Sequence, residues 1–144
     1  MLRRVTSILM AFAFVFVASA AENGELDKLQ GKWEVKKTNE EGDKVTQVLE
    51  IKKDAMHFKI LDASGETKLV AKATVKLQKA GAFKTLTISN IQAGEDEDSL
   101  GHADGERAYV YQLIDRTLTI VSNMDEAREQ PPTLDTYKKV SDAK

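Results

Sequence analysis

Apolar and polar residues alternate with a period of two along most of the chain beyond residue 30. Between residues 31 and 36, Trp33 and Val35 fall on one face, and charged side chains fall on the other. This alternation is typical of an antiparallel strand with one buried face. Similar segments predict further strands at 45–51, 56–60, 68–77, 83–91, 107–114, 118–121 and 134–140.

The connections between the predicted strands are mostly short. Gly42 and Gly65 stand in two of them, in polar sequences where a tight turn favours a positive φ. Short connections let each strand pair with the next one along the chain. The pattern therefore predicts an all-β fold, a single antiparallel up-and-down barrel of about eight strands, with a sandwich as the alternative.

Two segments are less regular. In 83–91 the inward face stays open, because Leu86 and Ile91 fall on opposite sides of the predicted strand. The segment from Gln92 to Gly105 is predicted as one long irregular loop, with three glycines and a run of four acidic residues. A loop of this length in a small domain is usually functional or disordered, and the sequence leaves its role open.

The first 20 residues have the features of a signal peptide. Arg3 and Arg4 give a positive start, ten apolar residues follow from Ile8 to Val17, and Ala18-Ser19-Ala20 fits the small-x-small cleavage rule. Ten apolar residues are too few to cross a bilayer, which needs about 20; a retained anchor is the alternative. We therefore expect cleavage after Ala20, a secreted or periplasmic protein, and no transmembrane segment after cleavage.

Residues 21–144 are enough for one domain with its own core. At its start, 21–28 is predicted as a short helical turn or a loose arm, because Leu26 and Leu29 lie three positions apart and can share one face. No longer helix is expected after the leader.

Composition narrows the chemistry and the partners. The chain has no cysteine, which excludes disulfides, thiol chemistry and cysteine-based zinc sites. The leader holds two of the 21 basic residues and none of the 23 acidic ones, so the domain is mildly acidic, and no basic face stands out. We therefore expect no nucleic-acid partner, and no motif identifies a protein partner.

The acidic loop suggests a metal site only weakly. Asp96 and Asp98 begin a sequence like a calcium-binding EF-hand loop, but Leu100 and Arg107 stand where that loop needs oxygen ligands. A charge run of this kind is usually a solvated loop. Asp96 and Asp98 are therefore weak metal candidates, and no metal is predicted.

No arrangement of catalytic residues is recognised in the chain. His57 is predicted on the outward face of its strand and His102 in the long loop, and nothing in their spacing requires that they converge. The serines stand in no nucleophile-elbow sequence. We therefore expect no catalytic residues, no cofactor and no enzymatic activity.

The order of short motifs along the domain resembles a known family. A leucine-x-glycine-x-tryptophan start, a tyrosine strand running into threonine-leucine-threonine, a loosened arginine-proline-threonine segment and a closing strand occur at Leu29–Trp33, Tyr111–Ile120, Arg128–Thr133 and Thr136–Val140. In this order the chain resembles the lipocalin-like group. More closely it resembles a family of small secreted domains, mostly uncharacterised, that is abundant in planctomycete bacteria.

The resemblance implies a lipocalin-like barrel over residues 21–144. In true lipocalins, an arginine or lysine near the last strand packs over the tryptophan ring at the closed end of the barrel. Arg128, Lys138 and Lys139 are the cations available here, and their spacing singles out none of them.

Four aromatic residues are candidates for ligand binding: Phe58, Tyr109, Tyr111 and Trp33. The first hypothesis is a binding protein that holds a small apolar or amphipathic molecule in a cavity of a few hundred Å³, with Trp33 chiefly a core anchor that closes the bottom. Because eight-stranded barrels either pack solid or hold one small ligand, the alternative is a structural or protein-interaction module of the cell envelope with a packed core. There the 92–105 loop or a strand edge carries the contact.

Overall fold

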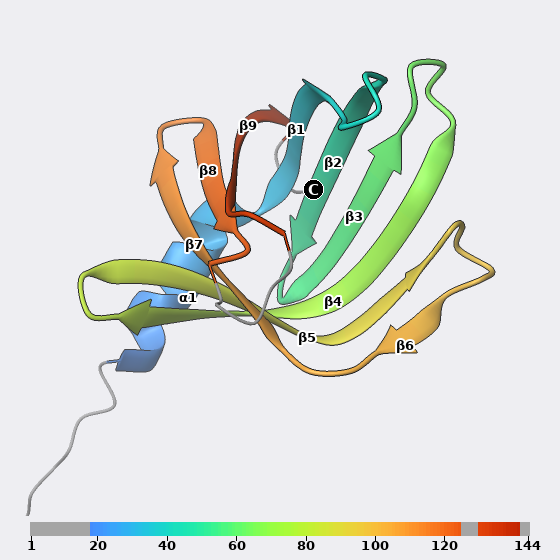
Figure 1. The fold of residues 1–144 in the computed structure, drawn as a ribbon. Coiled ribbons are helices and arrows are strands. Elements are labelled where there is room, and N and C mark those ends of the chain that lie inside the picture. Colours follow the sequence, from blue (N-terminus) through green and yellow to red (C-terminus); the bar gives the residue numbers. More distant parts are fainter. Residues whose placement is uncertain (1–17, 125–129, 142–144) are drawn as a thin grey trace, which may run out of the picture.

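The computed structural model describes residues 18–124 and 130–141. This part of the chain contains one helix and nine strands (Figure 1): α1 (Ala18–Leu29), β1 (Gly31–Thr38), β2 (Lys44–Lys52), β3 (Ala55–Leu61), β4 (Thr67–Ala80), β5 (Phe83–Gly94), β6 (Gly101–Ala103), β7 (Arg107–Ile114), β8 (Thr117–Ser122) and β9 (Thr133–Ser141). The predicted leader lies outside the described residues except for 18–20, which begin α1. Arg128 also lies outside them.

Eight of the strands close into an antiparallel barrel. The hydrogen-bonded order is β4-β3-β2-β1-β9-β8-β7-β5, and β5 pairs in turn with β4, while β6 is an additional strand beside β5. The first and last strands meet, because β1 pairs with β9. The predicted all-β class and the eight-stranded barrel are confirmed.

Strand β5 contains a bulge that explains its mixed pattern. Its register with β4 shifts between Lys72 and Thr74, and Asn90 takes a positive φ of 51° there. One extra residue in β5 moves the alternation by one position. As a result Leu86 before the bulge and Ile91 after it are both buried in the core.

The prediction of one irregular loop from Gln92 to Gly105 is wrong. Strand β5 continues to Gly94, and β6 returns to pair with Ile91 to Ala93. Because of the bulge, β5 continues in the wall of the barrel beyond residue 91, where the predicted strand ends. The connection between β5 and β6 is therefore only the short segment 95–100.

The prediction of a short turn or loose arm at 21–28 is also wrong. Helix α1 has 12 residues and ends at Leu29, which is fully buried, while Leu26 packs against the same core. The side-chain amide of Gln30 donates to the carbonyl of Lys53 at 2.8 Å and accepts a hydrogen bond from the Lys53 amide. These contacts hold the helix against one end of the barrel.

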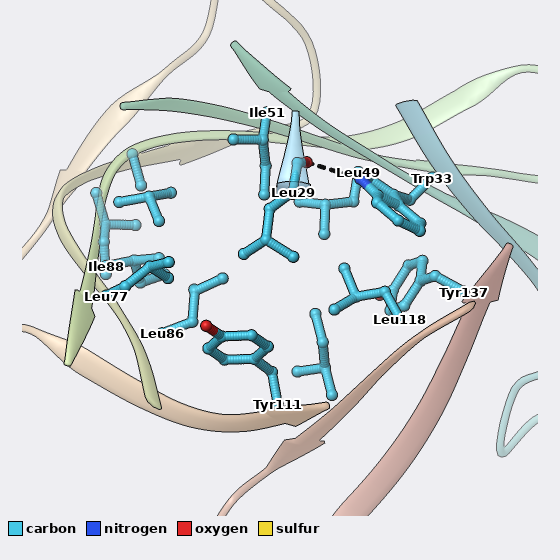
Figure 2. Packing of buried hydrophobic residues seen from close by; sticks show 14 residues of the cluster. Leu29, Trp33, Leu49, Ile51, Leu77, Leu86, Ile88, Tyr111, Leu118 and Tyr137 are labelled. Carbon is cyan, nitrogen blue, oxygen red and sulfur yellow. Dashed lines mark hydrogen bonds between the residues drawn. The ribbon is translucent and has the colours of Figure 1, made fainter. Parts of the chain in front are cut away.

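We call the end that carries α1 the closed end and the opposite end the open end. The closed end has the β2–β3, β4–β5 and β7–β8 turns, and the open end has the β1–β2, β3–β4 and β5–β6 connections. The core lies toward the closed end (Figure 2), where Leu29 from α1 meets Trp33, Ile51, Leu86 and Leu118 from the strands. The helix therefore completes a core that the strands alone would leave uncovered.

Candidate functional site

Trp33 lies at the closed end and joins the barrel to the helix. Its side chain is fully buried, and its Nε1 donates a hydrogen bond to the carbonyl of Leu29 at 2.9 Å (Figure 2). The Nζ atom of Lys139 lies 5.3 Å from the centroid of the indole ring. Lys138, in contrast, donates to Thr117 Oγ1 at 2.9 Å. Of the two candidate cations that the structure describes, Lys139 is the one placed over the tryptophan.

Tyr111 is also part of the packed core. Only 5% of its surface is exposed, and it lies beside Leu86 in Figure 2. Burial raises the pKa of its hydroxyl, and the charge of Glu25 on α1 adds to this effect. Two of the four aromatic candidates, Trp33 and Tyr111, are therefore placed where the interior is already filled.

A buried pair of hydrogen-bonded polar side chains lies beside this core. The Tyr137 hydroxyl donates to Gln47 Oε1 at 2.8 Å, and both residues are buried. Removal from water raises the pKa of the Tyr137 hydroxyl, and Asp135 and Tyr109 raise it further. The hydroxyl therefore stays protonated at neutral pH and acts as a donor.

Other inward side chains, from the middle of the strands toward the open end, are only half-buried. They share the inward face of their strands with the core residues, by the alternation of a β-strand. We call them the open-end section: Val35, Val45, Phe58, Ile60, Leu69 and Tyr109. Phe58 and Tyr109, the other two aromatic candidates, thus pack against the core on one side and are still partly reached by water.

The open-end section has a polar edge on the side of β1 and β9. Lys37 Nζ lies 2.9 Å from Asp135 Oδ1, and 34% and 16% of the two side chains are exposed. Lys37 faces inward because it is the cross-strand partner of Val45 on β2. This ion pair therefore joins the neighbouring strands β1 and β9 near the open end.

The surface of the barrel has two hollows. The rim hollow, of about 470 Å³, lies between the β1–β2 hairpin and the β3–β4 turn, and includes Lys37, Val45 and Asp62. The outer hollow, of about 480 Å³, is lined by Thr85, Val110 and Met124 among others. The lining residues run along 106–110 and include the inward-facing Tyr109 between the outward-facing Ala108 and Val110. This hollow therefore reaches from the outer face of the wall to one of the aromatic candidates. Neither hollow is the enclosed interior cavity that the first hypothesis predicts.

The acidic connection 95–100 is held on the outer face of the barrel by Glu97. Lys72 Nζ lies 2.6 Å from Glu97 Oε2, Lys59 Nζ lies 3.8 Å from Oε1, and His57 Nε2 lies 2.8 Å from Oε1, although the His57 contact is not aligned as a hydrogen bond. The hydrogen bond from Lys72, followed by the nearby charge of His57, lowers the pKa of Glu97. At least one acid of the run thus has a structural partner.

The two weak metal candidates lie in the same connection. Asp96 Oδ1 accepts a hydrogen bond from the Asp98 amide at 2.9 Å, and the Asp96 amide donates to Ser99 Oγ at 3.2 Å. These bonds shape a tight turn of the chain. Within residues 18–124 and 130–141, no three histidine, aspartate or glutamate side chains are grouped so that they could hold a metal ion.

Sequence reasoning found the aromatic part of the open end and missed its polar part. Gln47 had a visible signal, because it is a polar residue on a strand face that also holds Val45 and Leu49. No such signal exists for Lys37 and Asp135, because their contact joins residues 98 positions apart and local alternation says nothing about distant pairs.

Comparisons of the chain with protein-family models, curated proteins and solved structures find no match. The eight-stranded antiparallel barrel nevertheless fits a lipocalin-like fold. Among the described residues, no helix has both the length and the apolar character needed to span a bilayer.

Proposed function

We propose that this protein is a non-enzymatic, secreted or periplasmic barrel that binds one small apolar or amphipathic molecule at its open end. The observation that carries the proposal is the graded burial of the inward side chains. Trp33 and Leu118 at the closed end are fully buried, whereas Phe58 and Tyr109, farther toward the open end, are half-buried. Apolar surface that faces inward and still contacts water is surface that a ligand can cover.

The lining of the open end matches an amphipathic molecule. Val45, Phe58 and Ile60 form an apolar wall on β2 and β3, and the Lys37–Asp135 pair forms a polar edge on β1 and β9. The apolar part of a ligand would lie against the wall, with its polar group at the edge. The rim hollow, which Lys37 and Val45 both line, gives such a molecule an approach from solvent.

The polar groups of the open end are engaged with one another. Lys37 is paired with Asp135, and the Tyr137 hydroxyl is bonded to Gln47. Groups held in this way can orient a bound molecule, but they are not poised as a nucleophile beside a base. Binding is therefore the role that we assign to them.

The test is native mass spectrometry, with lipid extraction, of the protein purified from its own host. The expected result is a small molecule that travels with the folded protein. Ala71→Trp should remove it, because Ala71 is half-buried and lies directly opposite Phe58 across β3 and β4. Val45→Trp, at the rim, provides a second blocking variant should Ala71→Trp not fold.

Ala108→Trp is the matched control. Ala108 is exposed and lines the outer hollow, so the same added indole there should leave the bound molecule in place. Loss of the molecule in Ala108→Trp alone would move the site to the outer hollow. A protein that carries no small molecule at all would favour the alternative, a structural or protein-interaction module of the cell envelope with a packed core.

A further inference from the structure

The β4–β5 hairpin ends in an exposed apolar tip at the closed end. The four residues from Ala80 to Phe83 are all exposed and uncharged, and 64% of the Phe83 surface is open to solvent. In Figure 1 this hairpin extends to the left, beyond the β7–β8 turn. A large aromatic side chain at a protruding tip has no role in the core of its own domain.

Two lysines flank this tip at directly opposed positions. Lys79 and Lys84 are cross-strand partners, and like charges in such a pair destabilise a hairpin. The charge of Lys84 is partly compensated by Glu25 of α1, whose Oε2 atom lies 2.9 Å from Lys84 Nζ. Lys79, in contrast, makes no ion pair with any described residue. A hairpin that opposes two lysines beside an exposed phenylalanine breaks local rules of stability, which is typical of a binding surface.

The two ends of the barrel differ in charge. The closed-end turns add Lys52, Lys53 and Arg116, beside Asp54 and Asp115, to the lysines of the hairpin, and α1 brings Glu25, Asp27 and Lys28 to the same end. In the open-end connections 39–43, 62–66 and 95–100, every charged residue is acidic. A negatively charged surface would therefore repel the open end and leave the closed end, with its paired lysines at the hairpin, as the end that approaches it.

We propose that the tip formed by residues 79–84 docks the protein on the surface of an anionic lipid bilayer. Aromatic side chains are favoured at the boundary between head groups and acyl chains, and lysines beside them bind lipid phosphates. Phe83 enters this boundary and Lys79 lies at the head groups. The open end then faces away from the membrane. The inference stands on the closed end alone and does not depend on the ligand proposed above.

The experiment is co-sedimentation of the full chain with vesicles, after intact mass spectrometry has established its N-terminus. Vesicles of phosphatidylglycerol and phosphatidylcholine in equal parts should bind the protein, and vesicles of phosphatidylcholine alone should bind it weakly. Phe83→Ser should reduce partitioning at least about tenfold, from the apolar area that no longer enters the bilayer. Lys79→Gln should reduce it about fivefold.

Two matched variants decide the result. Leu134 has the same exposed fraction as Phe83, 64%, and lies at the open end, so Leu134→Ser should bind vesicles like the unmodified chain. Lys44→Gln, also at the open end, is the control for Lys79→Gln. Equal losses in the variants of the two ends, or no preference for phosphatidylglycerol, would overturn the proposal. So would a Phe83→Ser variant that keeps full vesicle binding but abolishes self-association, since the tip would then contact a second copy.

Discussion

Lys139 and Trp33 face each other across the seam where the last strand of the barrel meets the first. They are cross-strand partners on β9 and β1, and the Lys139 Nζ atom lies 5.3 Å from the centroid of the indole ring. This distance is within the range of a cation–π contact. Because Trp33 also bonds to the Leu29 carbonyl, the indole connects the helix, the first strand and the last.

Replacing Lys139 by Met tests the energy of this contact. The methionine keeps the apolar stem over the ring but removes the charge, so the free energy of unfolding should fall by about 1 kcal/mol. Urea unfolding followed by the fluorescence of Trp33, the only tryptophan, measures the change. Lys138→Met is the control, because Lys138 is exposed, and it should change stability by less than about 0.5 kcal/mol. Equal losses in both variants would contradict a specific contact with the ring.

The buried bond between Tyr137 and Gln47 gives a second prediction. Tyr137→Phe leaves Gln47 Oε1 buried without its donor at 2.8 Å, so the free energy of unfolding should fall by about 1–3 kcal/mol. Gln47→Leu should also lower the free energy of unfolding, because it leaves the buried Tyr137 hydroxyl without its acceptor. The double variant Tyr137→Phe with Gln47→Leu should lose less than the sum of the two single variants, because no polar partner is then left unsatisfied. Strict additivity in denaturant unfolding would show that the pair does not act as a unit.

The barrel was predictable because each strand buries one face, which leaves a period of two in the sequence. The segment 107–114, for example, coincides with β7. The pattern failed where one residue changed the local backbone. Asn90, with its positive φ, moves the alternation within β5, and an alternation rule that assumes a continuous strand ends too early. Helix α1 was underestimated because distant contacts hold it, such as that between Glu25 and Lys84.

In the candidate site, too, alternation predicted some features, and contacts between distant residues determined the others. Alternation placed Phe58 and Tyr109 on inward faces, and their positions along the strands put them farther from the closed end than Trp33. It could not separate them from Trp33 and Tyr111, because the depth of a side chain along the barrel axis depends on strand register and on the helix that closes one end. The polar partners could not be predicted from the sequence, since Gln47 and Tyr137 are 90 positions apart in the chain.

The β3–β4 turn should respond to acid through Asp62. Its Oδ1 accepts hydrogen bonds from the Ser64 hydroxyl at 2.6 Å and from the Ser64 and Glu66 amides. These bonds lower the pKa of Asp62 from 3.8 to about 2, and the bond from the Ser64 hydroxyl has the largest effect. Because the pKa is lower in the folded chain, the contribution of the carboxylate is complete above its ordinary pKa and is lost as the pH falls through about 2.

Asp62→Asn isolates this contribution, because the asparagine oxygen can accept the same bonds but does not titrate. The difference in unfolding free energy between the unmodified chain and the variant should be constant at neutral pH. It should shrink as the pH falls from 3.8 toward 2. Thermal unfolding over a pH series measures it. A difference that does not vary with pH would show that the carboxylate charge does not contribute.

The β5–β6 hairpin depends on a close approach at Gly94. A Cβ atom added there would lie 2.4 Å from the backbone oxygen of Ser99, so Gly94→Ala must move the chain of the connection 95–100. The move should break the contacts of Glu97 with Lys72 and reduce the protection of the hairpin amides against hydrogen exchange. Overpacking of this kind costs about 1–3 kcal/mol, here as a local opening of the hairpin.

Gly101→Ala is the control within the same hairpin. Nothing lies within 4 Å of a Cβ atom added at Gly101, so this variant should keep both the protection of the hairpin amides and the contact between Glu97 and Lys72. The two variants add the same methyl group to the same supersecondary unit and differ only in what that group meets. If Gly101→Ala opened the hairpin as much as Gly94→Ala, the loss of glycine itself, and not the contact with Ser99, would be the cause.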